Sequence, residues 1–285
     1  MKKGDRFFKF ITLSPIVIYT SLLILLPLIY IFFLSFCKND SYGGIIYDFT
    51  LSNYIAIFDI TYLNIFVKSS LIAFIATFIC ICISYPFALI LRERSENLQN
   101  LMTKLIMIPF LTNSLIRTYG WIVLLRKNGI VNSILITSGL IENPLSLMYN
   151  NLGIIIGMSY TLLPFMVLPV CSSVFKIDNT LIEAARDLGA KPWAIFKKII
   201  IPETISGVFN GSLMVFIPAI GYFFISDILG GGKAMIIGNL IKNQFLTARN
   251  WPFGSAISIF LIIITFFLVW IYRKLGGKLD DLGGM

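Results

Sequence analysis

The chain has 285 residues, of which 57% are hydrophobic and only 13% are charged, and it contains no histidine. Soluble globular domains are roughly 45–50% apolar and about 25% charged, so this composition excludes an ordinary water-soluble fold. Without histidine, Ser-His-Asp and Cys-His catalysis and histidine-ligated zinc are excluded as well. The net charge is +9, but the basic residues form short clusters between long apolar runs. This pattern favours a membrane protein over a nucleic-acid-binding protein.

Six stretches are long and apolar enough to cross a bilayer core of roughly 30 Å, which takes about 20 residues of helix. They are Phe10 to Cys37, Ser69 to Leu91, Leu105 to Leu125, Leu152 to Phe175, Thr204 to about Ser226, and Trp251 to Tyr272. A weaker stretch, Gly129 to Ile141, is too short to span and indicates an interfacial or re-entrant helix. Lys and Arg gather before Phe10, in 92–104, in 176–203 and after Tyr272, so the positive-inside rule places both termini in the cytoplasm. We therefore expect an all-α integral membrane protein with six transmembrane helices, forming one domain over residues 1–285.

The longest cytoplasmic segment, residues 176–203, predicts two short helices. Thr180 followed by Glu183 forms a capping box, which starts a helix that runs through Leu188. Gly189 then supplies a left-handed C-cap. Pro192 suits the first turn of the second helix, and Pro202 is expected to stop that helix. Two alanines on the first helix leave a bare surface, so the segment is suited to docking a partner.

The spacing in this segment resembles a known motif, E-A-A-x-x-x-G-x9-I-x-L-P, the loop found in type I ABC importer permeases. Ile201 stands where that motif usually has leucine. The resemblance implies that the loop couples the chain to a cytoplasmic ATPase by seating in a groove of that subunit. The residues that match are Glu183, Ala184, Ala185, Gly189, Ile199 and Pro202.

The resemblance extends over most of the chain to the permeases of spermidine/putrescine ABC transporters (PotB type). It is carried by residues 115–121, 162–169, 183–189, 216–221 and 227–239. Tyr222 and Ser226 differ from that group, which usually has an acidic residue and a proline there. The resemblance implies a MetI-like fold, two copies of an ABC ATPase, a second homologous permease, an extracytoplasmic polyamine-binding protein, and a bacterial inner-membrane location.

An importer needs an energy source, but the chain has no G-x-x-x-x-G-K-[ST] phosphate-binding loop. The nearest stretch, Gly230 to Lys233, ends in Ala234 and lacks the first glycine; it indicates a flexible turn. We therefore expect no catalytic residue, metal site or cofactor in this chain. ATP and magnesium would be bound by the partner ATPase.

Ionisable residues within membrane spans are costly, which makes them candidates for function. Arg117 lies in the outer half of the third expected span and Asp227 near the outer end of the fifth. For a polyamine, Asp227 could hold an ammonium group, while Tyr119, Trp121 and Tyr222 could offer cation–π faces. Equally, the arginine could reach the interface or pair with a carboxylate, Asp227 could simply lie at the interface, and the aromatic residues could be interfacial anchors.

Three other functions are weighed against polyamine import. An ABC permease for another small solute, such as ferric ion, sulfate or thiamine, would share the loop but differ in residues 216–239. A proton- or sodium-driven carrier would show internal repeats and carboxylates at mid-membrane, which this sequence does not show. An intramembrane enzyme would need histidine or a convincing Ser or Asp pair.

Overall fold

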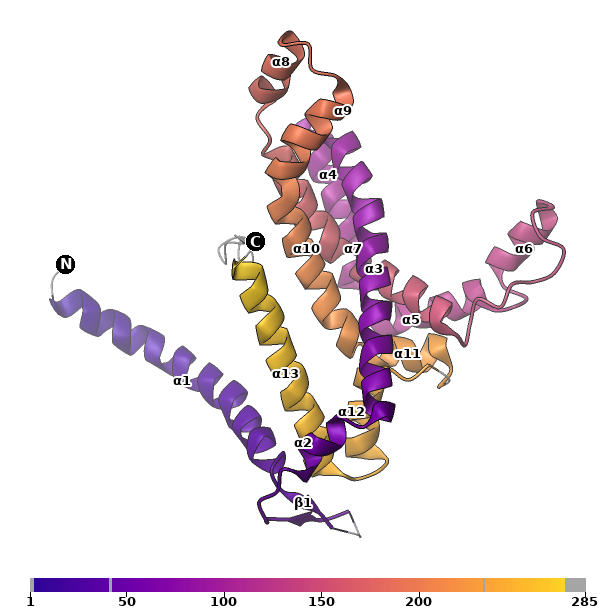
Figure 1. Ribbon diagram of the computed structural model, residues 1–285. Helices are drawn as coiled ribbons and strands as arrows, with labels where there is room; N and C mark the ends of the chain where they lie inside the picture. Colours follow the sequence, from indigo (N-terminus) through magenta and orange to yellow (C-terminus); the bar gives the residue numbers. More distant parts are fainter. Residues whose placement is uncertain (1–2, 41–42, 233, 275–285) are drawn as a thin grey trace. The chain divides into compact units, whose positions relative to one another are not determined.

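The chain folds almost entirely into helices in the computed structural model, which describes residues 3–40, 43–232 and 234–274 (Figure 1). A short antiparallel hairpin joins β1 (Lys38–Asn39) to β2 (Ile45–Ile46), with Lys38 opposite Ile46. The helices are α1 (Lys3–Leu34), α2 (Ser52–Ile57), α3 (Ile60–Arg92), α4 (Glu96–Met107), η1 (Ile108–Leu111), α5 (Ser114–Leu125), α6 (Ile130–Thr137), α7 (Asn151–Phe175), α8 (Asn179–Asp187), α9 (Pro192–Ile195), η2 (Phe196–Ile200), α10 (Ile201–Gly221), α11 (Phe223–Gly230), α12 (Ile237–Leu246) and α13 (Trp251–Lys274).

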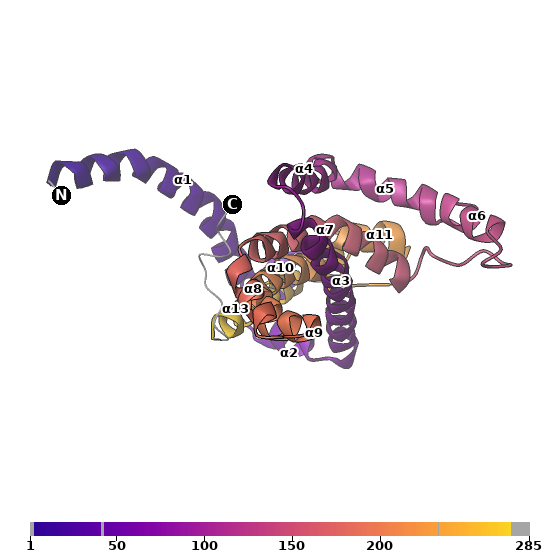
Figure 2. The same cartoon turned by 90° about the horizontal axis from the view of Figure 1, so that it is seen from above.

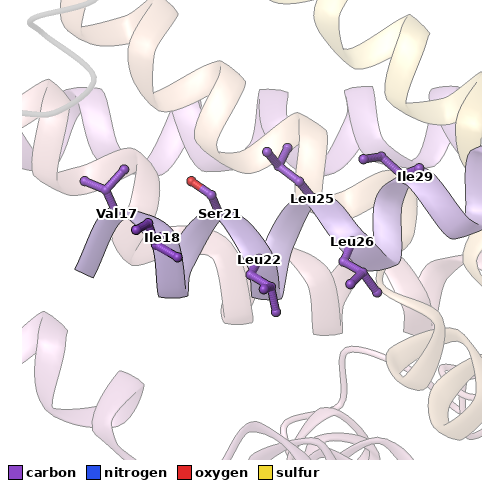
Figure 3. A pocket seen from close by; sticks show the side chains of 7 residues that line it. All are labelled: Val17, Ile18, Ser21, Leu22, Leu25, Leu26 and Ile29. Carbon is purple, nitrogen blue, oxygen red and sulfur yellow. The ribbon is translucent and has the colours of Figure 1, made fainter. Parts of the chain in front are cut away.

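Five helical segments among the described residues are long and apolar enough to cross a membrane. They are Ser14–Leu34, Ile60–Arg92, Asn151–Phe175, Pro192–Gly221 and Trp251–Ile271. All five overlap expected spans. The first has an open apolar surface, suited to contact with lipid tails, whose side chains follow α1 (Figure 3): Val17, Ile18, Ser21, Leu22, Leu25, Leu26 and Ile29.

The expected span from Leu105 to Leu125 is not one helix. It is divided into α4, η1 and α5, because Pro109 has no backbone N–H to continue an α-helix and its ring disfavours the helical conformation before it. The chain is extended at Thr112, and Asn113 caps the next helix by accepting a hydrogen bond from the Leu115 N–H at 2.8 Å. Figure 2 shows α4, α5 and α6 following one another along one side of their unit.

The fifth expected span also differs at both ends. It ends at Gly221, because Tyr222 leaves the helical conformation with φ −75° and ψ 69°, and α11 is a separate helix. At the other end Pro202 does not stop the preceding helix. The Ile201 N–H bonds to the carbonyl of Phe196 five residues earlier, and this π-helical turn lets the helix continue past the proline. The expected stop at Pro202 was therefore wrong.

The described residues form two compact units. One consists of residues up to 63 with 240–264, and the other of residues 64–239 with the chain from 265 onward. In the second unit α7 and α10 pack along each other, and two glycines of α10 spaced as G-x-x-x-G, Gly207 and Gly211, allow this close approach. A Cβ on Gly207 would lie 2.5 Å from the Pro169 carbonyl oxygen, and one on Gly211 would lie 2.5 Å from the Met166 sulfur.

Candidate functional site

The start of α8 is fixed by Asp178, whose carboxylate accepts a hydrogen bond from the Thr180 N–H at 2.9 Å. This hydrogen bond holds the pKa of Asp178 below its usual value of 3.8. The expected capping box was therefore wrong. The helix begins at Asn179, so Thr180 lies inside its first turn and Glu183 stands on the exposed surface of α8.

The end of α8 confirms the left-handed cap at Gly189. This glycine has φ +77°, and its N–H donates to the Arg186 carbonyl at 2.8 Å. The Ala190 N–H donates to the Ala185 carbonyl at 2.9 Å. These two bonds form a Schellman motif, which satisfies carbonyls that the helix end would otherwise leave unpaired. The chain therefore makes a sharp, well-defined reversal between α8 and α9.

A small hydrophobic cluster holds the two helices of the loop together. Its buried members are Ile177, Ile182 and Ile195, and its partly buried members are Ala185, Ala190, Ile199 and Ile200. The motif residues are thus divided between two environments. Ala185 and Ile199 pack in the cluster, whereas the others are exposed to solvent: Glu183, Ala184, Gly189 and Pro202.

The outer surface of the loop is apolar at two prominent positions. Leu188 is 88% exposed and Trp193 is 71% exposed. The Trp193 ring stacks on Phe196, with 5.5 Å between ring centroids. Large apolar side chains held in this way on a rigid surface are typical of a protein-binding site. In Figure 1, α8 and α9 lie at one end of their unit, beyond the ends of α7 and α10.

A second group of candidate residues gathers around Arg117, where α5 lies beside α7. The guanidinium carbon is 6.0 Å from the centre of the Phe110 ring and 5.9 Å from that of the Tyr160 ring, within cation–π range. Trp121, one helical turn from Arg117, packs edge-on against Tyr160 at 5.2 Å. Phe110 in turn packs edge-on against Phe165 at 5.0 Å. The structure therefore surrounds the Arg117 charge with aromatic side chains.

The expected path residues do not all join this cluster. Tyr222 lies near enough to interact electrostatically with Arg117. Within the described residues, the buried Nε of Arg117 has no hydrogen-bond partner. Tyr119 is 58% exposed, because two residues along a helix rotate a side chain by about 200° from Arg117. Its place on a transport path stays a prediction.

Asp227 lies on α11, which packs against α5 and α7. Its carboxylate accepts a hydrogen bond from the side-chain amide of Asn239, which is 5% exposed. The same amide donates to the Phe223 carbonyl at 3.1 Å, and the Asn239 oxygen accepts from the Ile236 N–H at 3.2 Å. Asn239 thus holds Asp227 in place from twelve residues further along the chain. The glycine turn between them has left-handed Gly231 and Gly232, while Lys233 lies outside the described residues.

Comparison with known proteins gave curated relatives over nearly the whole chain. The chain is 42% identical to the spermidine/putrescine transport system permease protein PotB of Salmonella typhimurium, covering 98% of this chain and 99% of the relative. It is 40% identical to the PotB protein of Haemophilus influenzae, covering 96% of each. The chain belongs to the PotB family of transport permeases. No protein-family model matched the sequence.

The fold of this PotB-family chain is also that of solved ABC importers. It matches a chain of a bacterial alginate ABC transporter with a TM-score of 0.75 at 14% identity, covering 95% of this chain and 96% of that one. It matches a chain of the MetNI methionine ABC transporter with a TM-score of 0.54 at 18% identity, covering 73% and 91%. Together with the five apolar helical segments, these matches identify an all-helical, multi-pass membrane protein with the fold of ABC importer permeases.

Sequence reasoning missed the side chains that contact the candidate site residues of this PotB-family chain. Tyr160 and Asn239 are the partners of Arg117 and Asp227, and both lie in other helices. Arg92 and Tyr85 contact the loop from α3. Only Asn239 carried a signal, since it closes one of the sequence stretches that resemble the family. The other three could not be found without the fold.

Proposed function

We propose that this chain is the membrane-spanning subunit of an ATP-driven importer of polyamines such as spermidine and putrescine. The observation that carries the proposal is the near-complete match, at 40–42% identity, to permeases named for these substrates. ATP and magnesium are bound by two copies of a separate ABC ATPase, because the sequence has no phosphate-binding loop of its own. A second homologous permease, an extracytoplasmic polyamine-binding protein and a bacterial inner membrane complete the assembly.

The chain crosses the membrane six times as a single permease domain, with both termini in the cytoplasm. The sixth crossing is the divided segment from α4 to α5. Support comes from the concentration of Lys and Arg in the segments placed inside, residues 92–104 and 176–203 among them. A break at Pro109 is tolerated where neighbouring helices satisfy the freed backbone groups, and α4 and α5 both contact α7.

Residues 176–203 form the contact with the ATPase. The hydrophobic cluster and the Schellman motif keep the loop rigid, and Leu188 and Trp193 supply an exposed apolar surface. Glu183 and Ala184 lie on the exposed part of α8, where a partner can approach the helix closely. Rigidity matters because a docking surface passes on movement only if it does not deform when pushed.

Asp227 holds an ammonium group of the cargo, and the aromatic rings around Arg117 line the same path. A carboxylate offers charge-assisted hydrogen bonds to an ammonium group, and α11 brings Asp227 to the side of α5. Asp227→Asn should raise the spermidine concentration for half-maximal uptake by about tenfold or more, as expected for loss of a charged hydrogen bond. Glu142→Gln removes one carboxylate from the exposed segment after α6 and is the matched control. Unchanged uptake in Asp227→Asn would remove this residue from the path.

The function is tested by uptake of labelled spermidine and putrescine into cells with and without the gene, in the presence of its partner subunits. Loss of uptake on deletion, restored by the gene, is expected. Unchanged uptake of both polyamines would refute the cargo. Uptake of ferric ion, sulfate and thiamine in the same strains would then test the other solutes. The differences from the spermidine/putrescine permeases at Tyr222 and Ser226 are the reason to test them.

A further inference from the structure

The C-terminal end of α3 is hydrogen-bonded to the segment that connects α7 to α8. The Nη2 of Arg92, the last residue of α3, donates to the Ile177 carbonyl at 3.1 Å and to the Asn179 side-chain oxygen at 2.6 Å. Asn179 is the first residue of α8. One guanidinium nitrogen therefore bonds both the segment that follows α7 and the first residue of the loop helix α8.

The segment that follows α9 also contacts α3. Tyr85 lies two helical turns before Arg92, so both side chains are on one face of α3. The Tyr85 hydroxyl is 2.7 Å from the Thr204 hydroxyl, and Thr204 is fully buried. The Tyr85 ring packs edge-on against Phe196, at 6.0 Å between centroids. Both arms of the coupling loop are thus held by the same helix.

The N-terminal part of α3 is hydrogen-bonded to the segment that positions Asp227. The hydroxyl of Ser69 accepts a hydrogen bond from the Ile237 N–H at 2.9 Å, with both residues buried. Asn239, two residues further along the same segment, donates to the Asp227 carboxylate. From Ser69 to Arg92 the chain is a single helix, which contains Pro86 and still extends for about 35 Å at 1.5 Å per residue (Figure 1).

We propose that α3 is a rigid connection between the ATPase-docking loop and the Asp227 region, and that Arg92 is the positioning residue that fixes the loop to it. The inference rests on the proposed function of the loop. A continuous helix moves as one body, so a displacement of α8 and α9 passes to Ser69 and Ile237 only while the Arg92 and Tyr85 contacts hold. Without Arg92, α8 can tilt about its hydrophobic cluster and leave α3 where it is.

The test uses the full complex, with both permeases, the ATPase and the loaded binding protein, reconstituted in proteoliposomes. The quantity measured is the amount of ATP hydrolysed per spermidine transported. Arg92→Gln should lower uptake by about tenfold, as expected for loss of charge-assisted hydrogen bonds, while ATP hydrolysis stays within about twofold of the wild type. Arg94→Gln removes the same charge from an exposed side chain two residues away and should leave the ratio unchanged.

Two further variants separate coupling from folding. Asn179→Ala removes the side chain on α8 that accepts the Arg92 hydrogen bond. Like Arg92→Gln, it should raise the amount of ATP hydrolysed per spermidine transported. The double variant should be no worse than Arg92→Gln alone, because both changes remove one interaction. A wild-type ratio in Arg92→Gln and Asn179→Ala, at equal protein levels, would overturn the role of α3 while leaving the proposed function intact. A wild-type complex whose ATP hydrolysis does not respond to loaded binding protein would instead refute the proposed function, and this inference with it.

Discussion

Gly189 provides the sharpest test of the loop, because at this position the effect of backbone strain can be separated from the effect of a steric clash. It has φ +77°, and a Cβ built there meets no heavy atom within 4 Å. Replacement therefore costs backbone strain and no clash. An L-residue in this conformation costs roughly 1–2 kcal/mol, less for Asn, which bonds locally, and more for a β-branched residue. Since about 1.4 kcal/mol corresponds to a tenfold change in an equilibrium, Gly189→Ala should weaken ATPase binding by about five- to thirtyfold.

The variants should rank Asn, then Ala, then Val, in order of increasing damage. The assay is the concentration of purified ATPase that half-saturates the reconstituted permease, together with substrate-stimulated ATP hydrolysis. Gly139→Ala is the matched control, because Gly139 has φ +72° and equally open surroundings but lies outside the coupling loop. Equal damage from Asn and Val would refute the argument from strain and indicate a clash with the partner. Wild-type binding in all three would show that the left-handed turn is dispensable.

Two further predictions concern stability. Gly207→Ala should lower the melting temperature of the purified protein, because the new Cβ would lie 2.5 Å from the Pro169 carbonyl oxygen and overpacking costs about 1–3 kcal/mol. A Cβ at Gly120 would meet no atom within 4 Å, so Gly120→Ala is the control and should be neutral or stabilising. Equal melting temperatures for the Gly207→Ala and Gly120→Ala variants would contradict this prediction. The hydrogen bond from Thr180 that lowers the pKa of Asp178 stabilises α8 at neutral pH. This stabilisation is lost as the pH falls through the lowered pKa, below 3.8. Asp178→Asn should remove this part of the acid dependence of unfolding, and an unchanged dependence would refute it.

The sequence predicts best those features that depend on local chemistry. The absence of charge over about 20 residues marked the segments now seen as long apolar helices, and Gly189 marked its turn because only glycine enters that conformation cheaply. The start of α8 was harder. Asp178 and Thr180 both have side chains able to cap a helix two residues apart, so the pattern could not decide which of them would accept the bond.

The candidate site was predicted as residue types and not as an arrangement. Arg117 and Trp121 share a face because they are four residues apart, and the same periodicity could have separated Tyr119 from them. Their partner Tyr160 comes from α7, and no local pattern relates it to α5. Arg92 is a stronger case. It meets Asn179 across 87 residues of sequence, and before the fold is known it reads as an ordinary basic residue at a helix end.

The two prolines that interrupt regular helix lead to opposite outcomes, and the difference has a functional consequence. Before Pro202 the chain adopts a π-helical turn, so the helix remains continuous from Pro192 to Gly221. At Pro109 the chain instead becomes extended, and a new helix starts beyond it. Continuity is therefore kept in the helix that leaves the proposed docking loop, where a rigid body would pass on displacement. The break falls beside Arg117 of α5, where Phe110 from η1 and Tyr160 from α7 both lie against one guanidinium. A proline's effect on a membrane helix thus depends on whether the preceding turn can widen to accept its ring.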